Sequence, residues 1–290
     1  MKGTINKPTS LNAARRVRIV GEGVDEWGNR YVKLRVKDSA QDIPAFKVAD
    51  LVKDPTRLFA ALANAGWNGL TSKARTEVLK KLEERKREAP TFRVATRLGW
   101  NGDAFVLPGQ IFGDPKMPLE TVFGDLDPTM LAKYCTRGSL KQWRDKIAAL
   151  CINNSRLILS GCFAFTGPIL RFVDGPKGGG FEIWGDRETG KTTAAMVAGS
   201  VYGCHRGERR EQGFTESWNS TSAKIEVTAL VHRDCLLILD ETKLAGTNPR
   251  QRAEVVTTVA FTLAERTEKQ RLTNAGWARS WRGFFYRRRT

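Results

Sequence analysis

The sequence predicts an α/β protein whose C-terminal half is built on a mostly parallel sheet. Two segments carry this prediction. The first is a glycine-rich turn at residues 185–190, between a β-prone run and an Ala-rich helical run. The second is an unbroken apolar run at residues 235–239, which is typical of a strand buried on both faces of a parallel sheet. Strands that alternate with helices in this way are typical of the α/β class.

The first 137 residues are predicted to form a mixed α/β domain. Apolar side chains alternate over residues 17–37 on both sides of a polar turn, as in a β-hairpin. Asp54 and Pro55 are residue types favoured at a helix N-cap and at the first helical position, so a helix is expected there, ending at Gly66.

Further elements follow along the chain. A helix is predicted over residues 73–88, and residues 92–108 are interpreted as strand, turn at Gly99–Gly102 and strand. An amphipathic helix is predicted over residues 140–151, with Leu150 on its apolar side. Residues 157–170 are so apolar that one buried helix is expected. The second domain is predicted to span residues 138–290.

Residues 185–192 fit the pattern G-x-x-x-x-G-K-[ST] of a phosphate-binding loop, the Walker A motif. Glycine allows the backbone to turn its N–H groups toward phosphate oxygens. Lys191 supplies a positive charge for the phosphates, and the Thr192 hydroxyl can bind Mg²⁺. The predicted cofactor-binding residues are Gly185, Asp186, Arg187, Glu188, Thr189, Gly190, Lys191, Thr192 and Thr193. A glycine loop without a ligand is the alternative.

The apolar run at residues 235–239 ends in two carboxylates, Asp240 and Glu241, as in a Walker B motif. Ligands of open parallel sheets bind at the carboxyl ends of the strands, so these carboxylates are expected beside the loop. Asp240 and Thr192 are the candidate Mg²⁺ ligands. Glu241, as general base, and Lys191 are the candidate catalytic residues, with ATP and Mg²⁺ as cofactors. An ordinary core strand followed by a solvated acidic turn is the alternative.

The chain of 290 residues has a formal net charge of +17 and a pI of about 10.0. This balance favours a nucleic acid partner, DNA first, over a charge that serves solubility alone. Without a signal peptide or an apolar run of membrane-spanning length, a cytoplasmic protein with no membrane contact is expected. The five widely spaced cysteines are predicted to be buried, reduced thiols.

The chain also contains an ordered series of segments, at residues 98–102, 105–108, 138–143, 153–157, 180–203, 230–234 and 240–241. This series resembles the domain of unknown function 927 family of plasmid, phage and integrative-element proteins, which are described as helicase-like. The resemblance implies an additional-strand P-loop NTPase core of the RecA/AAA+ type, a class whose members commonly work as homo-oligomeric rings on nucleic acid. The family motif falls on Gly185, Gly190, Lys191, Thr192, Thr193, Asp240 and Glu241. His232 also fits a family position and is interpreted as a structural histidine.

The chain departs from the family pattern in several places. Arg187 and Glu188 stand where small polar residues are usual in the family. Thr242-Lys243 follows the acidic pair, where the family usually has Ile-Gly. The pattern continues beyond Phe285 with a sensor residue, so a core truncated at its C-terminus is expected. Basic side chains that fit either an arginine finger or a basic surface are Arg266, Lys269 and Arg271. Aromatic side chains that fit either base stacking or a core are Trp277 and Trp281.

Two functions remain open from the sequence. The first is an ATP-hydrolysing, helicase-like motor or remodeller that acts on DNA in a mobile genetic element. The second is a truncated nucleotide-binding module that binds DNA or a protein partner without significant hydrolysis. A small-molecule kinase fits less well, because the chain combines an Asp-Glu pair with a large basic N-terminal region.

Overall fold

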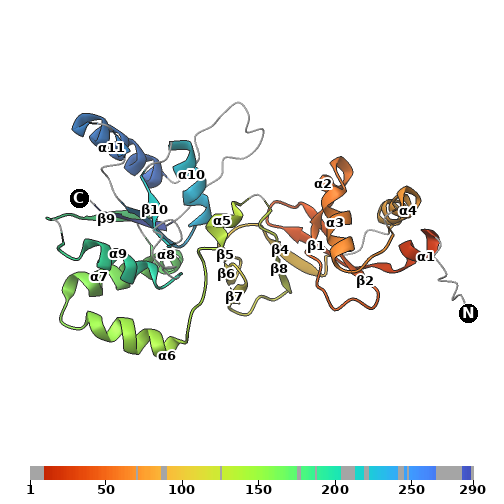
Figure 1. Ribbon diagram of the computed structural model, residues 1–290, viewed down its shortest axis with the longest axis horizontal. Coiled ribbons are helices and arrows are strands. Elements are labelled where there is room, and N and C mark those ends of the chain that lie inside the picture. Colours follow the sequence, from red (N-terminus) through yellow and green to blue (C-terminus); the bar gives the residue numbers. More distant parts are fainter. Residues whose placement is uncertain are drawn as a thin grey trace, which may run out of the picture. The chain divides into compact units, whose positions relative to one another are not determined.

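The computed structural model describes most of the chain, and the described part is α/β, as the sequence predicts (Figure 1). It divides into two compact units. The N-terminal unit comprises Met1–Thr96 and Asp114–Gly124, and the C-terminal unit comprises Arg97–Gly113 and Asp125–Thr290. The division into folding domains at residue 137 stays a prediction. The described residues are 10–69, 71–85, 90–124, 126–174, 178–186, 188–203, 213–218, 222–240, 245–246, 248–265 and 283–288.

The N-terminal unit contains a five-stranded mixed sheet with the order β3-β2-β1-β4-β8. Its centre is the predicted hairpin, in which β1 and β2 pair antiparallel, and this prediction is confirmed. The neighbouring strand β4 pairs parallel with β1, and β8 pairs parallel with β4. The strands are β1 (Val17–Asp25), β2 (Arg30–Val36), β3 (Phe46–Lys47), β4 (Phe92–Ala95) and β8 (Leu119–Thr121).

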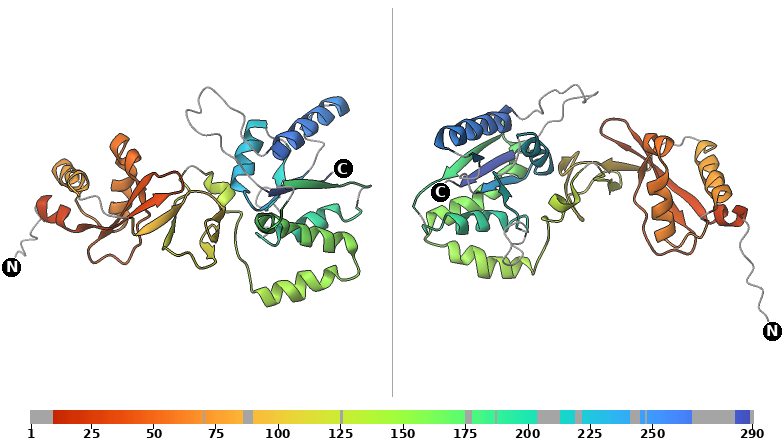
Figure 2. Two further views of the ribbon diagram at one scale, coloured as in Figure 1. Left: turned by 180° about the vertical axis from the view of Figure 1, so that it is seen from behind. Right: turned by 45° about the horizontal axis from the view of Figure 1, so that its top comes forward.

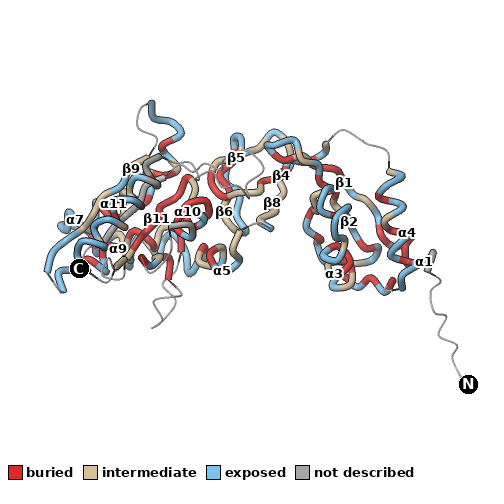
Figure 3. The backbone as a smooth tube through the Cα atoms, turned by 90° about the horizontal axis from the view of Figure 1, so that it is seen from above, coloured by how far each residue is buried: buried red, intermediate tan, exposed pale blue. Residues whose placement is uncertain are grey.

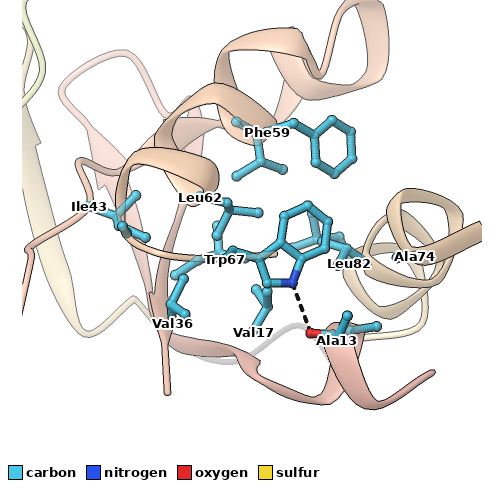
Figure 4. Close-up of a cluster of buried hydrophobic side chains, with 14 of the residues drawn as sticks. Ala13, Val17, Val36, Ile43, Phe59, Leu62, Trp67, Ala74 and Leu82 are labelled. Atoms are coloured by element: carbon cyan, nitrogen blue, oxygen red, sulfur yellow. Dashed lines mark hydrogen bonds between the residues drawn. The ribbon is translucent and has the colours of Figure 1, made fainter. Parts of the chain in front are cut away.

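In the part of the N-terminal unit that the structure describes, four helices accompany the sheet, and the main core lies between them and the hairpin (Figure 4). The Trp67 indole lies in this core and donates a hydrogen bond to the Ala13 carbonyl at 2.8 Å. The predicted helix at Pro55 begins one residue later, where the Asp54 carboxylate accepts the Thr56 N–H at 2.9 Å. The helices are α1 (Ser10–Arg15), α2 (Val48–Lys53), α3 (Thr56–Asn64) and α4 (Ser72–Glu83).

The C-terminal unit begins with a small antiparallel sheet of β5 (Gly99–Asn101), β6 (Ala104–Leu107) and β7 (Gln110–Phe112). The prediction of a turn at residues 99–102 is wrong, because residues 99–101 form a strand and the turn follows. The buried Asp234 carboxylate accepts the Trp100 N–H at 3.0 Å. A local sequence pattern cannot reveal this contact, since the partner lies 134 residues away.

The larger sheet of this unit has the order β10-β11-β12-β9, and all three of its strand pairs are parallel. β12 therefore lies between the strand that leads into the glycine loop and the strand that ends at Asp240. The prediction of a buried strand at residues 235–239 is confirmed, since Leu236 to Leu239 are all buried. The strands are β9 (Gly178–Ile183), β10 (Glu216–Ser217), β11 (Leu236–Asp240) and β12 (Gly283–Arg288).

Helices cover both faces of the larger sheet (Figures 1 and 2). α10 and α11 pack on Leu237 and Leu239, and together they form one apolar cluster. α7 and α9 lie on the other face, where Gly199 approaches Ile238. Figure 3 shows the resulting burial of β11 in red. The helices are α7 (Ser155–Ala164), α9 (Lys191–Gly199), α10 (Ser222–Val231) and α11 (Pro249–Glu265).

The amphipathic helix predicted over residues 140–151 is present but irregular. α6 (Leu140–Trp143) continues into a π-helical segment, Arg144–Ala148, and then into a 3₁₀ turn, Ala149–Cys151. A π-helical segment rotates the residues that follow it relative to a regular helix. Leu150 is therefore 74% exposed, and its predicted place on the buried side is wrong.

The prediction of one buried helix over residues 157–170 is wrong. α7 ends at Ala164, and a separate short helix, α8 (Thr166–Ile169), follows. Pro168 has no N–H with which to bond the Ala164 carbonyl four residues earlier. The Tyr202 hydroxyl donates to that carbonyl instead, at 2.8 Å. Ile158, Leu159 and Ile169 are about half exposed, because α7 and α8 present one side to solvent.

The prediction of buried cysteines is confirmed at two positions, Cys151 and Cys235. Cys135 is half-buried, and Cys204 lies outside the described residues. Cys162 is exposed on α7, so the prediction is wrong there. Among the helices that the structure describes, none is long and apolar enough to cross a bilayer.

Candidate functional site

The glycine loop between β9 and α9 uses backbone conformations that suit glycine. Gly185 has φ +152° and Gly190 has φ +82°, and Gly190 is the N-cap residue of α9. Glu188 also adopts the left-handed region, with φ +61°. For a residue with a Cβ atom this conformation costs about 1 kcal/mol, and such strain is common at ligand sites.

The Lys191 side chain lies inside this loop and is only 7% exposed. Its ammonium donates to the Gly185 carbonyl at 2.7 Å, to the Asp186 carbonyl and to the Thr189 hydroxyl at 3.4 Å. The Thr189 hydroxyl in turn donates to the Asp186 carbonyl at 2.9 Å. A buried ammonium is costly unless it is hydrogen-bonded, and these contacts supply the bonds. The loop therefore holds a fixed positive charge at the start of α9.

A cavity of about 340 Å³ adjoins the loop. This volume lies within the usual range of small-molecule sites, about 300–1,000 Å³. One wall comes from the end of β9 and from Thr189 to Lys191 with the first turn of α9, which includes Thr193 and Ala194. The helix N-terminus in this wall favours an anion. The cavity thus joins a cationic loop to a pocket large enough for an organic ligand.

A second wall of the cavity, here called the opposite wall, is formed by residues 153–157 at the start of α7. The Asn154 side chain accepts the Leu157 N–H at 3.2 Å and caps this helix. Asn153 and Arg156 are exposed beside it. Sequence reasoning did not place this segment in the site. A helix cap of the Asn-Ser type was visible, but no local pattern indicates that α7 starts opposite the loop.

Asp240 lies at the same edge of the sheet as the loop. In the parallel register, Leu239 pairs with Arg287 and Arg287 pairs with Glu182, so these residues share one level. The next residues, Asp240 and Ile183, are therefore level at the carboxyl end. Two strand spacings separate their backbones, or about 10 Å. Thr192 and Thr193 are exposed on the first turn of α9.

A buried polar cluster joins residues 133–134 to Glu216, the first residue of β10, and to His232 in the turn before β11. His232 is 2% exposed, and its Nδ1 lies 2.9 Å from the Tyr134 hydroxyl. Glu216 accepts a hydrogen bond from Lys133 at 2.7 Å. Burial alone would raise the pKa of Glu216, but His232 and Lys133 outweigh it and hold that pKa below its ordinary value. Burial raises the pKa of the neighbouring Cys235 thiol. His232 is enclosed by these groups, which fits a structural histidine.

Several predicted residues lie outside the described part of the chain. They include the candidate general base and one residue of the loop, together with the candidate finger and stacking side chains. They are Arg187, Glu241, Thr242, Lys243, Arg266, Lys269, Arg271, Trp277 and Trp281.

Comparisons with known proteins agree with this architecture. The family model for the domain of unknown function 927 matches residues 2–282. No curated protein matches the chain. The solved structure titled "SCCmec type IV Cch - active helicase" is similar, with a TM-score of 0.66 and 16% sequence identity. The match covers 94% of this chain and 50% of the other, so this chain spans about half the length of that protein.

Proposed function

This chain belongs to the domain of unknown function 927 family, and we propose that it is a helicase-like ATPase module that acts on DNA in a mobile genetic element. One observation carries the proposal. The buried Lys191 ammonium fills a glycine loop at the sheet edge that Asp240 shares. A phosphate-binding loop and an acidic strand end in this arrangement are the two halves of a nucleotide-hydrolysing site.

In this proposal the residues around the cavity bind Mg-ATP. The N–H groups of residues 185–193 and the Lys191 ammonium bind the phosphates. The Thr192 hydroxyl and the Asp240 carboxylate hold Mg²⁺, which would neutralise phosphate charge when bound. Glu241 acts as general base and accepts a proton from the attacking water. Asn153 and Arg156, on the opposite wall, contact the nucleoside.

The strand order supports a P-loop core of the additional-strand RecA/AAA+ type. β12 separates the loop strand β9 from β11, and an inserted strand at this place defines the additional-strand class. The likeness to a structure titled as a helicase supports the same fold at low identity. A homo-oligomeric ring belongs to the proposal as the assembly that this class commonly uses.

DNA is the proposed partner because of the chain's positive net charge and its similarity to a structure titled as a helicase. The net charge of +17 favours a polyanion, and the similar structure carries the word helicase in its title. Phosphate contacts of basic side chains supply most of the affinity of such proteins for nucleic acids.

ATP turnover with and without single-stranded DNA tests the proposal. The wild-type chain is expected to hydrolyse ATP faster when DNA is present. Lys191→Ala and Glu241→Gln are both expected to abolish turnover, and Lys146→Ala, at an exposed lysine, serves as the control. Equal background rates in all four proteins would contradict the motor function.

A nucleotide-binding module without significant hydrolysis is the second candidate. Glu188 bears on it, since this exposed carboxylate lies in the phosphate loop, where it repels the phosphates and would weaken ATP binding and slow turnover. Saturable ATP binding without turnover, at any DNA concentration, would support this candidate over the first. Replacement of Glu188 by Ser would then be expected to strengthen ATP binding.

A further inference from the structure

One end of the β1–β2 hairpin carries four cationic side chains on a single face. Arg18 pairs directly with Arg35 in the antiparallel register. The pairing continues past the strand ends, where the Lys37 N–H donates to the Arg16 carbonyl at 2.7 Å. Alternate residues of a strand share a face, and directly opposed residues do so too. Arg16, Arg18, Arg35 and Lys37 therefore form one group, here called the hairpin cation cluster.

The other face of the same hairpin end is fixed in the core. Val17 and Val36 pair with each other and are 1% and 0% exposed. Leu34 lies in the same apolar cluster, in which Figure 4 shows Val17 and Val36. The Lys81 ammonium also donates to the Val17 carbonyl at 2.6 Å. The cations thus project from a backbone held by buried side chains and by hydrogen bonds.

Within the described residues, several basic side chains of this unit have acidic partners, and the arginines of the cluster have none. Glu22 pairs with Arg30 and Arg85. Asp42 and Glu120 both pair with Lys33. Glu22, Asp42 and Glu120 are therefore paired with basic residues outside the cluster.

Arg18 and Arg35 are both exposed, and within the described residues neither has a carboxylate partner. Arg16 donates to the Lys37 carbonyl at 3.3 Å, which neutralises no charge. Asp38, the adjacent acid, is exposed and lies beyond the paired strands. Like charges directly opposite each other, with Cβ atoms about 5 Å apart, destabilise a sheet. A bound anion removes that cost.

We propose that the hairpin cation cluster binds the phosphate backbone of a nucleic acid strand. Arg16 and Lys37 flank the strand ends, and each lies two residues from the arginine of its strand, or about 6.7 Å along an extended chain, so the group spans several phosphates rather than one small anion. Guanidinium groups bind phosphate oxygens in a bidentate manner, which suits the opposed arginine pair. The inference rests on the proposed function only for the identity of the partner, because the cluster takes no part in nucleotide binding.

The test compares the full chain with two variants of equal net charge. Arg18→Gln with Arg35→Gln removes the opposed pair. Lys53→Gln with Lys73→Gln removes two exposed lysines from the helices of the same unit. Binding of labelled single-stranded DNA is measured over a range of salt concentrations. The arginine variant is expected to bind about tenfold more weakly than wild type. The slope of its log affinity against log salt concentration should be smaller in magnitude by about 1.4, and the lysine variant should bind as wild type does.

Three further measurements make the result specific. Arg18→Lys with Arg35→Lys keeps the charge and is expected to restore the salt slope. Thermal unfolding should show that Arg18→Gln with Arg35→Gln is at least as stable as wild type, since it relieves repulsion. ATP binding is expected to be equal in all variants, so a failure of the nucleotide site is separated from a failure of this surface.

Several results would overturn the inference. Equal losses in the arginine and lysine variants would assign DNA binding to net charge alone. Unchanged DNA binding in the arginine variant would exclude the cluster. Loss of binding to phosphatidylserine vesicles with unchanged DNA binding would assign it to a lipid surface. A wild-type chain that turns over ATP but binds no DNA would also overturn it, and would leave the nucleotide site intact.

Discussion

The Lys191 ammonium donates a hydrogen bond to the Gly185 carbonyl, 2.7 Å away, and so closes the glycine loop on itself. The lysine begins α9, and the glycine follows the end of β9. The contact therefore fixes the connection between the strand and the helix, and it holds the charge where an anion would meet it. The loop is thus organised by contacts of its own lysine.

The left-handed conformation of Gly190 gives a first prediction. A Cβ atom at Gly190 meets no atom within 4 Å, so Gly190→Ala adds backbone strain alone, with φ +82°. We expect destabilisation by about 1 kcal/mol and weaker ATP binding, because the loop relaxes away from its shape. Gly109→Ala is the matched control, with φ +73° and the same open space. It should lose similar stability in thermal unfolding and keep full ATP affinity.

The wall opposite the loop gives a second prediction. If Arg156 contacts the nucleoside, Arg156→Ala should weaken ATP binding about fivefold, or about 1 kcal/mol. Inorganic triphosphate lacks a nucleoside, so its affinity should not change. Lys191→Ala should weaken both ligands. Competition titrations measure all four values, and an equal loss of ATP and triphosphate affinity in Arg156→Ala would place Arg156 at the phosphates instead.

The junction between α7 and α8 gives a third prediction. The Tyr202 hydroxyl bonds the Ala164 carbonyl that Pro168 leaves without a helical partner. Tyr202→Phe should therefore destabilise the chain by about 1–3 kcal/mol, the cost of an unsatisfied buried group. Pro168→Ala supplies an N–H to the same carbonyl, so the double variant should lose less stability than the two single variants together. Strictly additive effects in chemical denaturation would show that the two groups are independent.

The lowered pKa of Glu216 gives a prediction on pH. Its folded-state pKa lies below the ordinary value of 4.5, so the Glu216 carboxylate stabilises the fold above that pH. This contribution is lost as the pH falls through the folded-state pKa. Glu216→Gln should be less stable than wild type at neutral pH, and the difference should shrink as the pH falls below 4.5. Urea denaturation at several pH values measures it, and a gap that widens toward acid would have the wrong sign.

Local signals in the sequence predict a large part of this architecture. The alternation over residues 17–37 and the apolar run at residues 235–239 reflect burial on one face and on two faces. The two strands of the hairpin and the buried strand β11 are found as predicted. The glycine loop was predicted because its conformations need particular residues at fixed positions. In each case the sequence pattern and the local structure follow from the same residues, which are close together in the chain.

The rest depends on contacts between distant residues. No local pattern indicates that β12 inserts between β9 and β11, or that residues 153–157 face the loop. The outward side of α7 is as apolar as a core helix, so its composition suggested burial that Ile158 and Leu159 do not have. Residues 99–101 pair with the nearby residues 104–106, and the Trp100 N–H bonds Asp234, far along the chain.

Calorimetric titration of the full chain with Mg-ATP tests the central claim most directly. The account predicts saturable binding by wild type, at least a tenfold loss of affinity in Lys191→Ala, and wild-type affinity in Lys146→Ala. Equal affinity in all three proteins, or no binding by folded wild type, would contradict the assignment of this loop as a nucleotide site.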